Sequence, residues 1–283
     1  FDGEIIACDS RTVYRDLDIG SAKPSRAEQQ RVRHHLVDVV DLNEDFTAAR
    51  FGELATACVQ DISSRGKLPI VCGGTGFYAR TLLEGLSIPS VPPDLPIRAE
   101  LQKFADENGN AALHARLAEL DAVSAGRLNA NDRFRIIRAL EVCMVTGKPF
   151  SEQAGQREES FETLWLGLTI RDRDSLRKLI ATRIQKQVES GMVEEVSQLY
   201  ARYGAADKLL RTVNYQDIVR YLQGELSLDK AIAECELHNS QLARRQMQWF
   251  KTNGKIHWFP VDEISPAALS EQAIAMVKTF IQS

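Results

Sequence analysis

Residues 65–78 read RGKLPIVCGGTGFY, and this stretch decides the fold class of the chain. Gly66 follows a helical pattern and is typical of the position just after a helix ends. Leu68 to Cys72 is a short apolar run of the kind that forms a buried parallel strand, and it leads directly into Gly73-Gly74-Thr75-Gly76. A helix is expected from Phe77. Helix, buried strand, glycine-rich turn and helix in succession predict a doubly wound α/β sheet.

A second buried strand is expected near the start of the chain. Glu4 to Cys8 (EIIAC) is a short apolar run that ends in Asp9-Ser10. Residues 35–40 alternate like another strand, and residues 46–64 carry apolar side chains at helical spacing. In an open α/β sheet the carboxyl ends of the strands border one ligand-binding crevice. We therefore expect Asp9-Ser10 and the Gly73–Gly76 turn to lie at the same crevice.

The pattern changes at a proline-rich bend, and only helices are expected directly after it. The bend holds Pro89, Pro92, Pro93 and Pro96. We read residues 91–163 as a helical insertion, and residues 1–90 and 164–283 as one α/β core with C-terminal helices. Within the insertion, helices are expected at 97–107, 111–120 and 132–146. Beyond it, a strand at 164–170 is expected to return to the sheet, before helices at 175–189, 193–203, 215–223 and 228–251, a strand at 256–259 and a closing helix.

Composition excludes several classes of protein. The 283 residues carry a net charge of −4, so a protein that holds nucleic acid by bulk charge is disfavoured and a local basic face would be needed. Apolar runs are too short for a membrane span. Five scattered cysteines without a C-x-x-C pair indicate reduced thiols in a cytoplasm rather than disulfides or a zinc site. The chain opens without methionine, just before a predicted strand, and we expect further residues upstream.

The glycine turn and Asp9 each allow a functional and a structural interpretation. Glycines let backbone N–H groups approach an anion, and a helix start favours negative charge, with the Thr75 hydroxyl as an added donor. An isolated G-G-T-G is equally consistent with a tight turn. Asp9 taken alone is more typical of a turn or cap carboxylate.

The same holds for the cations. Arg135 and Arg138 lie three residues apart and so share one helix face, for which an ordinary solvated surface is the alternative to RNA binding. Arg98 and Arg127, in the same insertion, favour a phosphate-binding surface. Arg244-Arg245 could bind phosphate or be simply exposed. The histidines have no metal-ligand spacing.

Together, these segments resemble the tRNA dimethylallyltransferase family of the bacterial type. The similarity follows the family's order over nearly the whole chain, which is far more specific than any single motif. The matching stretches are residues 3–24 (GEIIACDSRTVYRDLDIGSAKP), 34–41 (HHLVDVVD), 65–78, 131–142 (NDRFRIIRALEV), 147–149 (GKP) and 242–250 (LARRQMQWF).

The resemblance implies a P-loop-kinase-like parallel-sheet core with a helical insertion that grips the tRNA anticodon stem-loop. It also implies transfer of a dimethylallyl group from dimethylallyl diphosphate to the exocyclic amine of the adenosine 3′-adjacent to the anticodon, with release of diphosphate. Mg²⁺ is the implied cofactor, and a monomer without a membrane partner is expected.

The family's site residues carry over by position. Asp9 resembles the general base, and Thr75 resembles the residue near the transferred carbon and the diphosphate bridge. Diphosphate contacts are implied for Gly73, Gly74, Thr75, Gly76 and Arg183. Contacts to tRNA are implied for Asp9, Ser10, Arg11, Thr12, Arg98, Phe134, Arg135, Ile136, Ile137 and Arg138.

This sequence departs from the family pattern in several places. The phosphate-binding P-loop is absent from residues 1–283 and would lie roughly two dozen residues upstream, so no metal ligand is assigned here. Thr12 and Phe134 stand where Gln is frequent in the family. Asn214 replaces a usual Gly, and Asn239-Ser240 replaces a Thr-Arg pair.

Three other functions share parts of this pattern. A prenyltransferase acting on free adenine nucleotides would not need the basic insertion. A small-molecule P-loop kinase would transfer phosphate from ATP. A non-catalytic tRNA-binding protein would keep the arginines and tolerate loss of Asp9.

Overall fold

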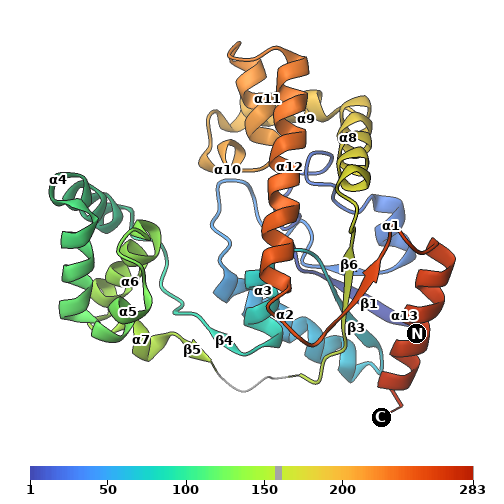
Figure 1. Ribbon diagram of the computed structural model, residues 1–283, viewed down its shortest axis with the longest axis horizontal. Coiled ribbons are helices and arrows are strands. Elements are labelled where there is room, and N and C mark those ends of the chain that lie inside the picture. Colours follow the sequence, from blue (N-terminus) through green and yellow to red (C-terminus); the bar gives the residue numbers. More distant parts are fainter. Residues whose placement is uncertain (157–160, 283) are drawn as a thin grey trace. The chain divides into compact units, whose positions relative to one another are not determined.

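The computed structural model of the chain describes residues 1–156 and 161–282 (Figure 1). They divide into two compact units. The core unit comprises Phe1–Phe46, Leu54–Ala79 and Glu162–Ser283, and the insertion unit comprises Thr47–Glu53 and Arg80–Phe161. This division assigns residues 80–90, before the predicted start of the insertion at 91, to the insertion unit. Residues 157–160 of the predicted insertion lie outside the described residues.

A three-stranded parallel sheet carries the start of the core unit. Strand β1 (Gly3–Ala7) pairs with β2 (His34–His35) and with β3 (Leu68–Cys72), in the order β2-β1-β3. The register pairs Ala7 with Cys72, so both strands end at the same edge. The predicted α/β fold with a parallel sheet is confirmed.

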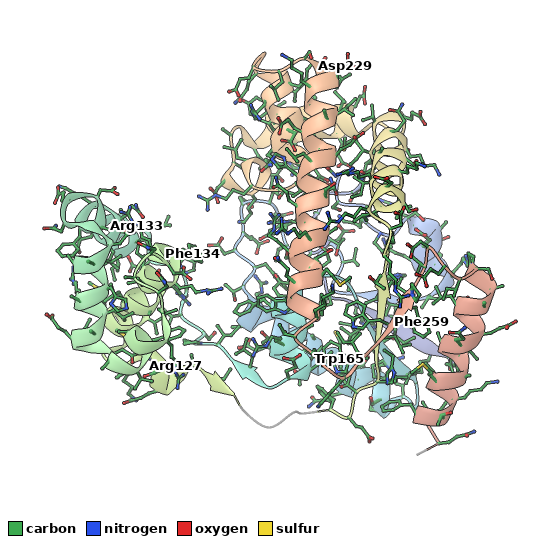
Figure 2. All side chains as sticks on the ribbon, viewed as in Figure 1. Arg127, Arg133, Phe134, Trp165, Asp229 and Phe259 are labelled. Atoms are coloured by element: carbon green, nitrogen blue, oxygen red, sulfur yellow. The ribbon has the colours of Figure 1, made fainter. Side chains whose placement is uncertain are left out.

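A second parallel sheet lies elsewhere in the core unit. Strand β6 (Trp165–Thr169) pairs with β7 (Ile256–Pro260), and Figure 2 labels Trp165 and Phe259 on these two strands. The expectation that this strand rejoins the sheet of β1 is wrong for the described residues, because β6 pairs with β7 alone.

The prediction that β3 is buried is also wrong. Ile70 in β3 is 41% exposed, and Leu168 in β6 is 63% exposed. An apolar run predicts a strand with both faces covered, but part of the Ile70 side chain is left uncovered by the described residues. Within residues 1–156 and 161–282, β3 pairs with β1 alone.

The strand predicted at 35–40 is cut short. Its ladder covers His34–His35, and Val40 makes only an isolated bridge with Tyr14. Leu36 and Asp38 take positive φ of 61° and 56°, which no β-strand accommodates.

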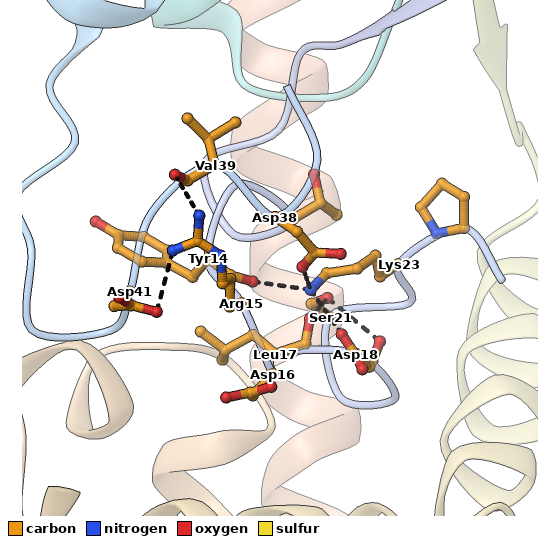
Figure 3. Close-up of polar contacts among 12 residues, drawn as sticks. Tyr14, Arg15, Asp16, Leu17, Asp18, Ser21, Lys23, Asp38, Val39 and Asp41 are labelled. Atoms are coloured by element: carbon orange, nitrogen blue, oxygen red, sulfur yellow. Dashed lines mark hydrogen bonds and ion pairs between the residues drawn. The ribbon is translucent and has the colours of Figure 1, made fainter. Parts of the chain in front are cut away.

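A buried lysine explains the turn at Asp38. Lys23 Nζ lies 2.5 Å from Asp38 Oδ1 and 2.6 Å from Asp18 Oδ1, and it donates to the Tyr14 carbonyl at 2.8 Å (Figure 3). The ion pairs of Lys23 hold this loop together with backbone hydrogen bonds from Asp38 to Thr12 and from Val39 to Val13.

Helices complete the core unit, where α12 packs against α8 and α11 (Figure 1). Their apolar faces bury Leu17, Ile184, Val196 and Tyr215 together. Helix α1 (Arg26–Arg31) is short, and helices α2 (Ala48–Ser64) and α3 (Gly76–Leu83) each continue from one unit into the other. The others are α8 (Arg173–Glu189), α9 (Met192–Tyr203), α10 (Asp207–Leu210), α11 (Tyr215–Leu222), α12 (Leu228–Phe250) and α13 (Pro266–Phe280).

The insertion unit is mainly helical. Gly109, at φ 85°, separates the two helical halves of α4 (Leu95–Leu120), in agreement with the predicted helices at 97–107 and 111–120. Asp132 caps α6 (Arg133–Thr146) at its start, and Gly147 ends it in the left-handed conformation. Two short helices, α5 (Ala122–Arg127) and α7 (Phe150–Gln153), and the antiparallel pair β4 (Leu86–Ser87) and β5 (Gly155–Gln156) complete the unit. Across residues 1–156 and 161–282, no helix is both long and apolar enough to cross a membrane.

Candidate active site

Two loops meet at the carboxyl edge of the β1–β3 sheet. The backbone N–H of Ser10 donates to the Thr75 hydroxyl at 3.0 Å, and the N–H of Thr75 donates to the Cys8 carbonyl at 3.2 Å. The structure therefore brings together the D-S and G-G-T-G segments, which the sequence placed at one crevice.

Asp9 has one oriented and one available carboxylate oxygen. Its Oδ1 accepts hydrogen bonds from the backbone N–H groups of Arg11 at 2.7 Å and Thr12 at 3.3 Å. These bonds form a local turn that fixes the carboxylate. Oδ2 has no hydrogen-bond partner within the described parts of the chain. Asp9 is half-buried, and this arrangement can present one oxygen to a substrate proton.

The glycines of the turn are needed for close packing. A Cβ added to Gly73 would overlap the Cys8 carbonyl, one on Gly74 would overlap Gln246, and one on Gly76 would overlap the Trp249 indole. These three glycines do not have positive φ. The Thr75 N–H is already donated to Cys8, so this amide is not free for the anion cradle expected from the sequence.

Helix α12 supplies the side chains that close over this turn. Gln246 Nε2 donates to the Gly74 carbonyl at 3.1 Å. The rings of Phe77 and Trp249 meet edge to face, with centroids 6.3 Å apart. Residues 242–250 match the family pattern, but no role was predicted for Gln246 or Trp249. Gln246 and Trp249 are three residues apart, so they share one face of the predicted helix. This spacing was the signal in the sequence that both could contact the same partner.

Thr12 does not present its side chain as the resemblance implied. It is 5% exposed, and its buried hydroxyl has no hydrogen-bond partner in the described part of the chain. Ser10 and Arg11 are half-buried. A direct tRNA contact by the Thr12 side chain is therefore not supported.

Two of the arginines expected to contact RNA, Arg98 and Arg138, bond to a buried carboxylate. Glu141 is fully buried and accepts from Arg98 Nε at 2.7 Å and Arg138 Nη1 at 2.6 Å. Arg138 Nη2 also donates to the Val91 carbonyl at 2.7 Å. Burial raises the pKa of Glu141, but the bonds from Arg98, Arg138 and the Asp94 N–H outweigh it, so the pKa lies below its ordinary value. We therefore assign these arginines to the insertion's own structure.

The remaining residues of the predicted RNA-binding stretch divide by exposure. Ile136 and Ile137 are buried in the insertion core, so their side chains cannot contact RNA. Phe134 is 73% exposed, at the start of α6 (Figure 2). Arg135 is also exposed, and among the described residues it pairs with Asp132 of its own helix cap, at 3.1 Å. Phe134 and Arg135 are the surface pair of this stretch.

Arg183 lies apart from the glycine turn. It is exposed on α8 and lines a cavity of about 320 Å³ with Ile19, Lys186 and Gln187. No residue of Gly73–Gly76 lines this cavity, so the structure does not place Arg183 with the other implied diphosphate contacts. No group of three or more His, Cys, Asp or Glu in the described ranges could hold a metal ion.

Known proteins match this architecture over almost its full length. The family model described as IPP transferase matches residues 12–253. The curated tRNA dimethylallyltransferase of Gloeobacter violaceus is 41% identical over 277 residues, covering 98% of this chain and 90% of the relative. The tRNA dimethylallyltransferase of a Roseiflexus species is 40% identical over 284 residues, covering 100% and 92%.

Solved structures of tRNA-modifying transferases are also similar to this chain. A tRNA isopentenylpyrophosphate transferase from Bacillus halodurans matches with a TM-score of 0.67 and 33% identity over 99% of this chain and 87% of that chain. A eukaryotic dimethylallyltransferase acting on tRNA matches with a TM-score of 0.80 and 25% identity, covering 100% of this chain and 74% of that one. The chain belongs to the IPP transferase family.

Proposed function

We propose that this protein transfers a dimethylallyl group from dimethylallyl diphosphate to the exocyclic amine of the adenosine 3′-adjacent to the anticodon in tRNA, releasing diphosphate. The observation that carries this assignment is the Asp9 carboxylate, whose Oδ1 is held by backbone amides, in a loop that the Ser10 N–H joins to the Thr75 hydroxyl. The names of the relatives support the same reaction class.

Asp9 is the proposed general base. An exocyclic adenine amine is a weak nucleophile, so a carboxylate must accept its proton as the new bond forms. The amine nitrogen bonds to the allylic carbon, the carbon–oxygen bond to diphosphate breaks, and diphosphate leaves with the bonding electrons. The amine proton passes to Asp9 Oδ2. A stacked base cannot reach this carboxylate, so the adenosine is expected to be flipped out of the loop.

Thr75 is the proposed donor to the leaving group. A hydroxyl has one hydrogen and two lone pairs. Because the Thr75 oxygen accepts from the Ser10 N–H, its own hydrogen is left to donate to a diphosphate oxygen. A donor aimed at developing negative charge lowers the barrier for its departure.

Magnesium is the cofactor that we expect to accompany diphosphate. The described residues do not form a metal cage, and we derive no step through the ion. Mg²⁺ commonly keeps substrate phosphates and water among its ligands, and so it requires few protein oxygens. It would neutralise charge on the leaving group.

Substrate competition separates this function from its rivals. The purified protein, with any native residues upstream of Phe1 present, should prenylate tRNA in the presence of Mg²⁺. It should leave AMP and ADP unmodified and transfer no phosphate from ATP. Prenylation of free nucleotides at a comparable rate, or ATP-dependent phosphorylation without prenyl transfer, would contradict the assignment.

A further inference from the structure

The turn Gly73–Gly76 is held from two directions. Strand β1 holds it through the bond from Thr75 N–H to Cys8 O and the bond from Ser10 N–H to the Thr75 hydroxyl. Helix α12 holds it through Gln246 and Trp249, which lie three residues apart and so share one helix face.

A single peptide plane connects the two supports. The Gly74 carbonyl and the Thr75 N–H belong to the same planar peptide unit. Gln246 Nε2 donates to its oxygen end at 3.1 Å, and Cys8 O accepts from its nitrogen end at 3.2 Å. Two bonds at opposite ends fix the rotation of this plane. Loss of either leaves the peptide free to turn, and the Thr75 side chain turns with it.

The absent side chains at Gly74 and Gly76 allow this contact. A Cβ on Gly74 would overlap the Gln246 amide, and one on Gly76 would overlap the Trp249 indole. Phe77, the next residue, meets the Trp249 ring edge on. The turn and α12 are therefore fitted to one another over consecutive residues rather than at one chance contact.

We propose that Gln246 is a positioning residue for prenyl transfer. Gln246 orients the Gly74–Thr75 peptide and thereby places the Thr75 hydroxyl. That hydroxyl in turn holds the backbone N–H of Ser10, the residue after Asp9. Gln246 acts through Thr75 and does not contact the reacting atoms. This inference rests on the proposed function, which supplies the reaction for which Thr75 must be placed.

A pair of isosteric substitutions isolates the hydrogen bond. Gln246→Met keeps length and removes the donor, and Gln246→Glu replaces the donor by an acceptor that repels the Gly74 carbonyl. Gln248, two residues on, is exposed. Gln248→Met and Gln248→Glu on the same helix are therefore the matched controls. Thermal melts establish that each variant is folded.

Two readouts test the proposal in the full-length protein. Turnover at saturating tRNA and dimethylallyl diphosphate should fall about 10- to 100-fold in both Gln246 variants, the cost of misplacing a reacting group. The KM for tRNA should change by less than about threefold, since binding groups are untouched. Without substrates, amide hydrogen exchange at Thr75 should rise about tenfold, while exchange within β1 stays unchanged.

Several results would overturn the inference. These are wild-type turnover in Gln246→Met, an effect confined to Gln246→Glu, or an equal loss in the Gln248 controls. Unchanged Thr75 exchange in Gln246→Met would also overturn it, whatever the activity. If the wild-type protein prenylates no tRNA, the proposed function fails, and the exchange measurement still decides whether Gln246 orders the turn.

Discussion

The hydroxyl of Thr75 accepts a hydrogen bond from the backbone N–H of Ser10 at 3.0 Å, between residues 65 positions apart in the chain. This bond joins the loop that carries the proposed base to the loop that carries the proposed diphosphate donor. The glycine-rich turn therefore matters for more than its flexibility. It places one hydroxyl where it can serve both loops.

Replacing Thr75 tests the hydrogen bond between the two loops directly. Thr75→Val keeps the branched shape but leaves the Ser10 N–H without its acceptor, so turnover should fall by about 10- to 1000-fold, comparable to loss of one oxyanion donor. Thr75→Ser retains the hydroxyl and should keep most of the activity. Steady-state kinetics with a parallel thermal melt checks both. If Thr75→Val melts far lower while its folded fraction turns over normally, Thr75 is only a structural turn residue.

Asp9→Asn should separate the turn from the base. The amide oxygen can still accept from the Arg11 and Thr12 N–H groups, but an amide cannot take the substrate proton. Turnover should fall by roughly 10²–10⁴, whereas tRNA affinity should stay within a few-fold. Asp229→Asn, an exposed carboxylate in the first turn of α12 (Figure 2), is the charge-matched control. A loss below about tenfold would remove Asp9 as the base.

Phe134 and Arg135 should contribute to RNA binding in different ways. Arg135→Ala removes a phosphate partner and should flatten the slope of log K against log salt by about one. Phe134→Ala should weaken binding with little change in slope, because stacking on an unpaired base involves no counterion release. Binding of tRNA measured across a salt series distinguishes the two. Unchanged affinity in both would move the RNA surface elsewhere, with Arg244 and Arg245 the next to test.

Glu141 should make the stability of the insertion depend on acid. Its pKa is lowered in the folded protein, so its stabilising effect is complete above the unfolded value near 4.3 and is lost as pH falls through the folded pKa. Wild type should therefore lose more unfolding free energy than Glu141→Gln between about pH 5 and pH 3. Urea unfolding of both at the two pH values makes the comparison. Equal losses of unfolding free energy in the two proteins would show that protonation of Glu141 is not coupled to unfolding.

Two departures from the family pattern prove to be partners. Asn239 Nδ2 donates to Asn214 Oδ1 at 2.6 Å, and Asn214 donates to the Gly20 carbonyl at 2.8 Å. Asn214 has φ 74° and ψ −51°, outside the left-handed helical region, so glycine suits this position, and the asparagine is held there by its side-chain hydrogen bonds.

A double-mutant cycle measures this pair. Asn214→Ala should cost about 1–3 kcal/mol, through strain at positive φ and the lost bonds. Asn239→Ala should cost less after Asn214→Gly than in wild type, with a coupling of about 0.5–1.5 kcal/mol. Additive urea-unfolding energies would show that the two asparagines act independently.

The spacing of apolar residues predicted many of the helices and strands. The features that it did not predict depend on contacts between residues far apart in the chain. The periodicity around β1 and α6 and the break at Gly109 could be read from spacing alone, since each depends on neighbours within a few residues. The exposure of Ile70 depends on which distant segments cover its face of β3, which spacing does not encode. Leu36 belongs to a segment that alternates like a strand, but positive φ at Leu36 and Asp38 ends the ladder after His35.

The candidate site shows the same division. Asp9 and Thr75 could be predicted to lie at one edge because each comes within three residues of the end of a strand, whereas their proposed roles came from the family resemblance. The bonds of Arg98 and Arg138 to Glu141 were not predicted, because the sequence does not reveal that Glu141, on the helix of Arg138, turns inward and is paired with both cations. Gln246 was missed because its partner is a backbone carbonyl 172 residues away.

The most direct test of the whole account is the mass and position of the product. Unmodified tRNA should be incubated with dimethylallyl diphosphate, Mg²⁺ and the full-length protein, then digested and mapped by mass spectrometry. The account predicts one added dimethylallyl group on the amine of the adenosine 3′-adjacent to the anticodon, and its near absence with Asp9→Asn. Modification at another nucleoside, or equal modification by Asp9→Asn, would contradict it.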